Sequence, residues 1–133
     1  MRRFKTFIVE DHDAFRQALL EGLSTRFPGM IFAEASTGHE VLPQVETFLP
    51  DLIFMDIKIP GENGLSLTQR IKAGYPETLV IILTSYDMPE YRQAAYERGA
   101  NDFLVKGSFT SEEILCLVES VLSAKGFNSL GSK

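Results

Sequence analysis

The segment Leu52–Asp56 reads LIFMD, four consecutive apolar residues that end in a carboxylate. A short apolar run without alternation is typical of a strand that is buried on both faces, as in a parallel sheet. Three further segments have the same form: Phe7–Asp11 reads FIVED, Leu79–Ser85 reads LVIILTS and Phe103–Lys106 reads FLVK. Ligands of open parallel sheets bind beyond the carboxyl ends of the strands, so these polar residues are expected at one functional edge.

Helical patterns separate the apolar runs along the whole chain. The sequence predicts strands at about 4–9, 30–35, 51–55, 79–83 and 103–105, and helices at about 13–26, 38–48, 65–71, 89–99 and 110–124. This alternation predicts an α/β fold in which helices cover both faces of a parallel sheet. The fourth helix has few large aliphatic residues, so we expect it to be the most movable.

Composition narrows the class of protein. The 133 residues predict one domain at 1–125, and the polar residues 126–133 predict a flexible tail or the start of a linker. The net charge of -5 argues against direct nucleic-acid binding by this domain. The single Cys116 lies in an apolar segment and is expected in the core. Without a membrane-length apolar run or a signal-peptide core, we expect a cytoplasmic protein with no membrane association.

The polar residues at the strand ends suit phosphoryl chemistry. Glu10, Asp11 and Asp56 would crowd negative charge into a small volume, which is costly unless a cation compensates. Oxygen-only ligation favours Mg²⁺, and a carboxylate can act as a nucleophile toward a phosphoryl group. Lys106 supplies a positive charge and Thr84 a hydroxyl donor. Each residue alone has an ordinary explanation as a cap, turn or surface residue, but their shared position at strand ends favours a common site.

Four motifs carry a resemblance to a known family. They read VEDH at 9–12, MDIKIPGENG at 55–64, LTSYD at 83–87 and GANDFLVK at 99–106. In this order and with these separations, the chain resembles the receiver domain of bacterial two-component response regulators over nearly its whole length. The resemblance implies a flavodoxin-like, doubly wound sheet of five parallel strands in the order 2-1-3-4-5.

The resemblance also implies a role for each site residue. Asp56 would accept a phosphoryl group from a sensor histidine kinase or a phosphotransfer protein. The implied Mg²⁺ ligands are Glu10, Asp11, Asp56 and the backbone carbonyl of Lys58. Thr84 and Lys106 would contact the phosphoryl group, and Phe103 would be the switch residue that turns inward with Thr84. The surface that changes would be the fourth helix and fifth strand, with a possible homodimer on phosphorylation.

Two departures from the commonest pattern are informative. Phe103 has no hydroxyl group, so a switch there must work through packing. Gly107 follows the lysine where many relatives have a proline. The pair Asp11-His12 and the missing proline resemble the subgroup whose output is a C-terminal helix-turn-helix DNA-binding domain, which lies outside these residues.

The favoured function is a phosphorylation-dependent signalling switch, an enzyme only in promoting its own phosphorylation and hydrolysis. The alternative is a Mg²⁺-dependent aspartyl phosphatase of related topology, which needs an acid two residues after the nucleophile, where this chain has Lys58. A degenerate receiver used only for binding would lack one of the key residues. A flavin-binding electron carrier would need a phosphate-cradling loop where Glu10 and Asp11 lie. A zinc site is not expected, because the chain has no cysteine cluster and no second histidine near His12.

Overall fold

The computed structural model describes residues 2–133 and has a single five-stranded parallel sheet in the order β2-β1-β3-β4-β5. The strands are β1 (Lys5–Val9), β2 (Ile31–Ala35), β3 (Leu52–Met55), β4 (Leu79–Thr84) and β5 (Asp102–Val105). The helices are α1 (Asp13–Arg26), η1 (Gly38–Glu40), α2 (Val41–Phe48), α3 (Gly64–Gly74), α4 (Pro89–Glu97) and α5 (Ser111–Ala124). The expected doubly wound α/β fold is confirmed.

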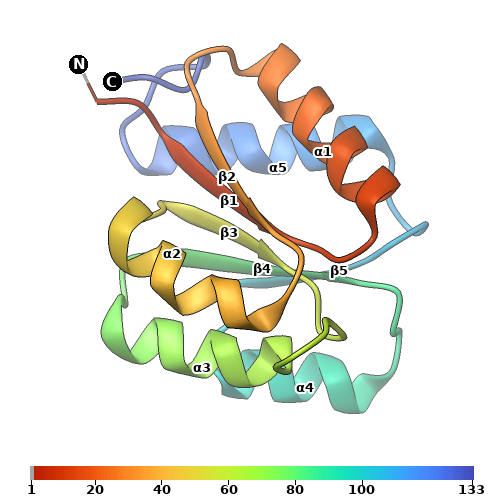
Figure 1. Cartoon of the computed structure of the whole chain (residues 1–133). Coiled ribbons are helices and arrows are strands. Elements are labelled where there is room, and N and C mark those ends of the chain that lie inside the picture. Colours follow the sequence, from red (N-terminus) through yellow and green to blue (C-terminus); the bar gives the residue numbers. More distant parts are fainter. Residues whose placement is uncertain (1) are drawn as a thin grey trace.

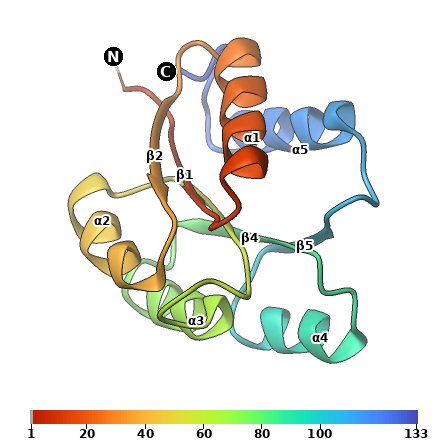
Figure 2. The ribbon, with the colours of Figure 1, turned by 45° about the vertical axis from the view of Figure 1, so that its right-hand side comes forward.

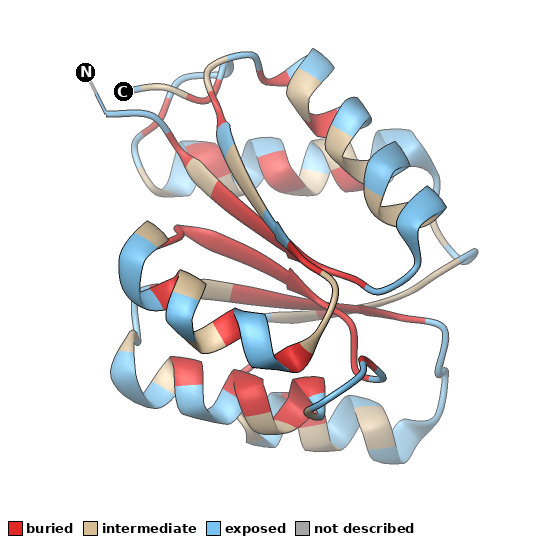
Figure 3. Cartoon of the chain, viewed as in Figure 1, coloured by how far each residue is buried: buried red, intermediate tan, exposed pale blue. Residues whose placement is uncertain are grey.

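Helices cover both faces of the sheet (Figures 1 and 2). Helices α1 and α5 lie on one face, and α2, α3 and α4 lie on the other. Alternate residues of one strand serve the two cores: Phe7 and Val9 belong to the core under α2–α4, whereas Ile8 belongs to the core under α1 and α5. Every residue of β3 is buried, as its continuous apolar run predicts (Figure 3).

The strand register brings the carboxyl ends of the central strands together. Val9 of β1 pairs with Met55 of β3, and Met55 pairs with Ile82 of β4. Residues that follow β1 and β3 are therefore neighbours at one edge. Thr84, the last residue of β4, pairs with Val105, so Lys106 also emerges at this edge.

The second helix and Cys116 test two local expectations from the sequence. The second helix begins with the single turn η1, and Pro43 is the third residue of α2, where a missing backbone N–H does not break the helix. The expectation that Cys116 lies in the core is wrong, because its side chain is exposed. The buried face of α5 consists of Ile114, Val118 and Leu122, and a residue two positions after Ile114 points to the opposite side.

Residues 126–133, which we call the C-terminal strap, are packed rather than extended into solvent. Backbone N–H groups of Phe4 and Lys133 donate to Gly131 O (2.8 Å) and Arg2 O (2.9 Å). Phe127 is only 7% exposed, and its ring packs edge-to-face with that of Phe4, with the two ring centres 5.0 Å apart. The expected flexible tail is thus held against the start of β1, because Phe127 completes the core under α1 and α5.

The helices within residues 2–133 include none that is long and apolar enough to cross a membrane.

Candidate phosphoryl-transfer site

Three carboxylates meet at the carboxyl edge of the sheet. Oxygen atoms of Glu10, Asp11 and Asp56 all lie within 4.8 Å of one another. Glu10 and Asp56 are 3% and 6% exposed, whereas Asp11 is open to solvent. Backbone N–H groups fix both buried carboxylates: His12 N donates to Glu10 Oε2 (3.0 Å), and Ile57 N donates to Asp56 Oδ1 (2.7 Å).

Lys106 reaches into this cluster from the end of β5. Its Nζ lies 2.5 Å from Glu10 Oε1 and 3.1 Å from Asp56 Oδ2. Burial alone would lower the pKa of Lys106, but the hydrogen bond to Glu10 and the charge of Asp56 outweigh burial and raise it. Burial raises the pKa of Glu10 above its ordinary value, although the hydrogen bond from Lys106 opposes this shift.

Two glycines next to the site have backbone environments that other residues do not readily accept. A Cβ atom at Gly64 would lie 2.0 Å from the carbonyl oxygen of Asp56, so the start of α3 approaches the β3 end as only glycine permits. Gly107 has a φ of 88°, a conformation that proline cannot adopt. A proline after Lys106, as in many relatives, would therefore need a different backbone conformation at this position.

The carboxylates line a hollow of about 370 Å³. Its walls are formed by Glu10, Asp11, His12, Phe15, Asp56, Lys58, Ser85, Tyr86 and Lys106. The ammonium of Lys58 lies 5.5 Å from the ring centres of both Tyr86 and Tyr91, which is cation–π distance. Lys58 therefore links the loop after β3 to the start of α4, on the open side of the hollow.

Thr84 and Phe103, the expected switch pair, are both buried. Thr84 is fully buried, and its hydroxyl accepts a hydrogen bond from Tyr86 N (3.3 Å). Phe103 is 3% exposed, so its ring faces inward. The guanidinium of Arg92 lies 4.7 Å above this ring.

Sequence reasoning missed three residues of this region. Phe15, expected only as a core residue of the first helix, has its ring 4.5 Å from the Lys106 ammonium. Its position in the first turn of α1, close behind the acids at the end of β1, was the available signal. Tyr91 and Arg92 of α4 carry no such signal, because polar and aromatic residues on a helix are usually solvated or core residues. The two histidines are exposed as expected, and His12 also caps α1 through Nδ1.

The donor set fits a divalent cation. Three carboxylates face one lysine, so the cluster keeps excess negative charge in a mostly buried place. The raised pKa of Glu10 reflects this cost, which a bound cation would offset. Carboxylate oxygens with an open, solvent-facing side are the ligands that Mg²⁺ prefers, since this ion keeps several of its waters.

The chain is similar in sequence to known proteins. The family model described as the response regulator receiver domain matches residues 6–119. The DNA-binding transcriptional regulator NtrC of Klebsiella pneumoniae is 34% identical over 123 residues, which are 92% of this chain and 26% of NtrC. The oxygen regulatory protein NreC of Staphylococcus haemolyticus is 32% identical over 124 residues, 92% of this chain and 57% of NreC.

Solved structures of receiver domains superpose on this chain. The signal receiver domain of NarL from Mycobacterium tuberculosis superposes with a TM-score of 0.82 at 28% identity, covering 95% of this chain and 99% of that one. A CheY-like receiver domain protein from Methanospirillum hungatei superposes with a TM-score of 0.85 at 23% identity, covering 93% and 97%, which supports the fold alone. The chain spans only about a quarter to just over half of the curated relatives described above.

Proposed function

The chain belongs to the receiver domain family of two-component response regulators, and on this premise we propose that Asp56 is its phosphoacceptor. Receiver domains are signalling switches that interact with histidine kinases. The observation that supports Asp56 most strongly is its position at the end of β3, 3.1 Å from Lys106 and beside Glu10 and Asp11. This chain's switch would then be driven by an aspartyl phosphate at that position.

The proposed transfer uses the residues in simple roles. A carboxylate oxygen of Asp56 attacks the phosphorus of a phosphohistidine whose ring is protonated on its other nitrogen. The P–N bond breaks, its electron pair stays on the ring nitrogen, and neutral imidazole leaves. The Lys106 ammonium, which pairs with Asp56 before the reaction, pairs instead with the phosphoryl oxygens once Asp56 carries the phosphoryl group. The Thr84 hydroxyl donates to a phosphoryl oxygen.

We infer that Mg²⁺ is the cofactor of this site. Glu10, Asp11, Asp56 and the backbone carbonyl of Lys58 would hold it, and the ion would shield the charge of the attacking carboxylate and the incoming phosphoryl group. An aspartyl phosphatase needs an acid where Lys58 stands. The chain's own catalysis is therefore limited to its phosphorylation and the hydrolysis of that phosphoryl group.

The wider setting is part of the same proposal. We propose that residues 1–125 form the receiver domain, with the C-terminal strap packed against it. A histidine kinase or a phosphotransfer protein in the cytoplasm supplies the phosphoryl group. NtrC is by name a DNA-binding transcriptional regulator, and by analogy we propose a C-terminal DNA-binding output domain and phosphorylation-dependent dimerisation for the full protein.

Intact-mass spectrometry tests the phosphoacceptor directly. With acetyl phosphate and Mg²⁺, the wild type should gain the mass of one phosphoryl group, and omission of Mg²⁺ should prevent this. Asp56→Asn should stay unlabelled. Asp51→Asn is a matched control, because Asp51 is a buried aspartate just before the same strand, where it pairs with Arg2. Equal labelling of Asp56→Asn and the wild type would refute the assignment.

A further inference from the structure

The contact between Phe15 and Lys106 lies inside the site and has no role in the chemistry described above. The Lys106 ammonium lies 4.5 Å from the centre of the Phe15 ring, in addition to its contacts with Glu10 and Asp56. We propose that Phe15 is a positioning residue, whose ring face holds the Lys106 ammonium at the phosphoacceptor. The proposal rests on the proposed function, because the benefit is to phosphoryl transfer.

Lys106 needs a contact that persists when Glu10 and Asp56 engage other groups. A lysine side chain has four rotatable carbon–carbon bonds, and holding its ammonium in one place costs conformational entropy. Glu10 and Asp56 now hold the ammonium, but both would engage a metal ion or a phosphoryl group during the reaction. The face of an aromatic ring attracts a cation in every one of these states. The ring can therefore keep the ammonium in the site when its carboxylate partners change.

Phe15 is itself well fixed. It lies in the first turn of α1, and its backbone N–H donates to Nδ1 of the capping residue His12 (3.3 Å). In the same turn, Nη1 of Arg16 donates to the carbonyl oxygen of Glu10 (2.7 Å), which ties α1 to the end of β1. The start of α1 is thus anchored to the end of β1, which carries Glu10 and Asp11. This anchoring fixes the position of the Phe15 ring relative to the site.

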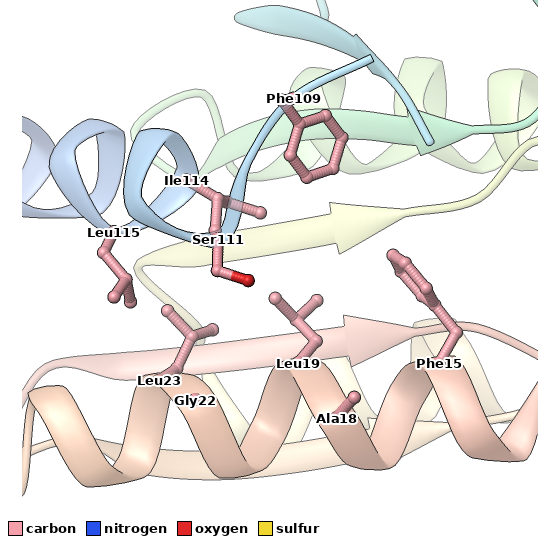
Figure 4. Close-up of a pocket in the computed structure, with 9 residues that line it drawn as sticks. All are labelled: Phe15, Ala18, Leu19, Gly22, Leu23, Phe109, Ser111, Ile114 and Leu115. Atoms are coloured by element: carbon pink, nitrogen blue, oxygen red, sulfur yellow. The ribbon is translucent and has the colours of Figure 1, made fainter. Parts of the chain in front are cut away.

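The Phe15 ring also borders an apolar groove. A groove of about 140 Å³ runs between α1 and α5 (Figure 4). Its lining includes Phe15, Leu19 and Leu23 of α1 and Ile114 and Leu115 of α5. Phe15 lines both this groove and the phosphoacceptor hollow. One part of the ring therefore packs against apolar neighbours, and its face toward Lys106 stays free for the cation.

Simple packing is the competing explanation for Phe15. A leucine fills similar apolar space but has no negative ring face, whereas a tyrosine keeps the ring. The positioning role predicts that Phe15→Tyr behaves as the wild type and Phe15→Leu does not. A packing role predicts that both variants behave alike. Leu19→Ala serves as a control, because it opens the same groove one helical turn further along α1.

NMR of the metal-free protein tests the contact itself. The ε-methylene protons of Lys106, assigned by comparison with Lys106→Met, should be shifted upfield by the ring current of Phe15. Phe15→Leu should abolish this shift, and Leu19→Ala should retain it. An unshifted Lys106 signal in the wild type would overturn the proposal without any reference to phosphorylation.

Phosphorylation kinetics then test the consequence. With acetyl phosphate and Mg²⁺, Phe15→Leu should label Asp56 about three- to tenfold more slowly, as expected for loss of a partly desolvated cation–π contact. Phe15→Tyr and Leu19→Ala should keep the wild-type rate, and Phe15→Leu should have no further effect in a Lys106→Met background. If the wild type is labelled at Asp56 but Phe15→Leu reacts at the same rate, the positioning role fails and the proposed function stands. An unlabelled wild type would instead refute the proposed function.

Discussion

Glu10 is a carboxyl group of the site whose pKa is raised. It is almost fully buried and lies beside two other carboxylates. Its pKa is raised by burial and by the charge of Asp56, although Lys106 and the backbone N–H of His12 favour the ionised form. A carboxyl group with a raised pKa keeps its proton up to a higher pH than an ordinary glutamate.

This shift predicts an unusual pH dependence of Mg²⁺ binding. A proton on Glu10 competes with the metal, so affinity should be constant above the raised pKa and fall as the pH drops through it. The loss should begin at a higher pH than for a carboxylate with the ordinary pKa of about 4.3. Calorimetric or NMR titrations with Mg²⁺ across mildly acidic pH would measure it.

Glu10→Gln provides the control for this experiment. It should bind Mg²⁺ more weakly at neutral pH, because a hard cation loses one of few protein oxygens. Its affinity should also vary much less over the same pH range. If the two proteins lose affinity in parallel on acidification, Glu10 is not the group responsible.

At the scale of elements, α4 is the part of the fold best placed to respond. Its buried surface is small, with Ala95 as the one fully buried residue among its described positions. It is tied to the site through Tyr91 near Lys58 and through Arg92 above Phe103. Because Phe103 is buried, any coupling between Asp56 and α4 through this residue would work by changes in side-chain packing.

Thr84→Ala tests whether this element is coupled to Asp56. Beryllofluoride, a phosphoryl mimic, should perturb NMR signals from Thr84 through Phe103 in the wild type. The alanine variant should still accept a phosphoryl group but show much smaller changes at Phe103 and α4, since the hydroxyl that follows the phosphoryl group is gone. Thr84→Ser keeps the hydroxyl and should respond as the wild type does. Identical responses in all three proteins would exclude Thr84 as the coupling residue.

Helix α1 contains a glycine, Gly22, at a position where the surrounding structure leaves room for a side chain. A Cβ atom at Gly22 would meet nothing within 4 Å, and glycine inside a helix costs about 0.5–1 kcal/mol relative to alanine. Gly22→Ala should therefore increase the free energy of unfolding by about that amount in urea denaturation. Gly64→Ala should instead be strongly destabilising, because of the clash with Asp56 O. A destabilised Gly22→Ala would contradict the open space at this position.

For the whole molecule, the C-terminal strap contributes to stability. Phe127→Ala should lower the free energy of unfolding by about 3 kcal/mol, the low end for a buried phenylalanine. Leu130→Ala, in the same strap but 52% exposed, should change it by less than about 0.5 kcal/mol. Urea denaturation of the two variants measures the difference. Equal, small effects would mean that the strap is not packed in solution.

Sequence reasoning succeeded where local pattern and topology agree. The apolar runs ending at Val9 and Met55 predicted buried strands, and the strand-end rule predicted that the following acids would meet. Their chemical roles stay predictions. The strap was missed because its hydrogen bonds join residues far apart in the chain, such as Phe4 and Gly131, which leave no local pattern. Cys116 was misplaced because apolar neighbours in a helix do not all share one face.

The strap also determines how the molecule would respond to mechanical tension. Residues 2–4 and 131–133 run antiparallel and lie side by side, with Arg3 bridged to Ser132 (Figure 1). A force that pulls Arg2 and Lys133 apart loads these hydrogen bonds one after another. While they hold, the parallel strands of the sheet carry none of the load. We therefore expect a force-extension measurement to record release of the strap first, at low force, with the sheet yielding only in a later step.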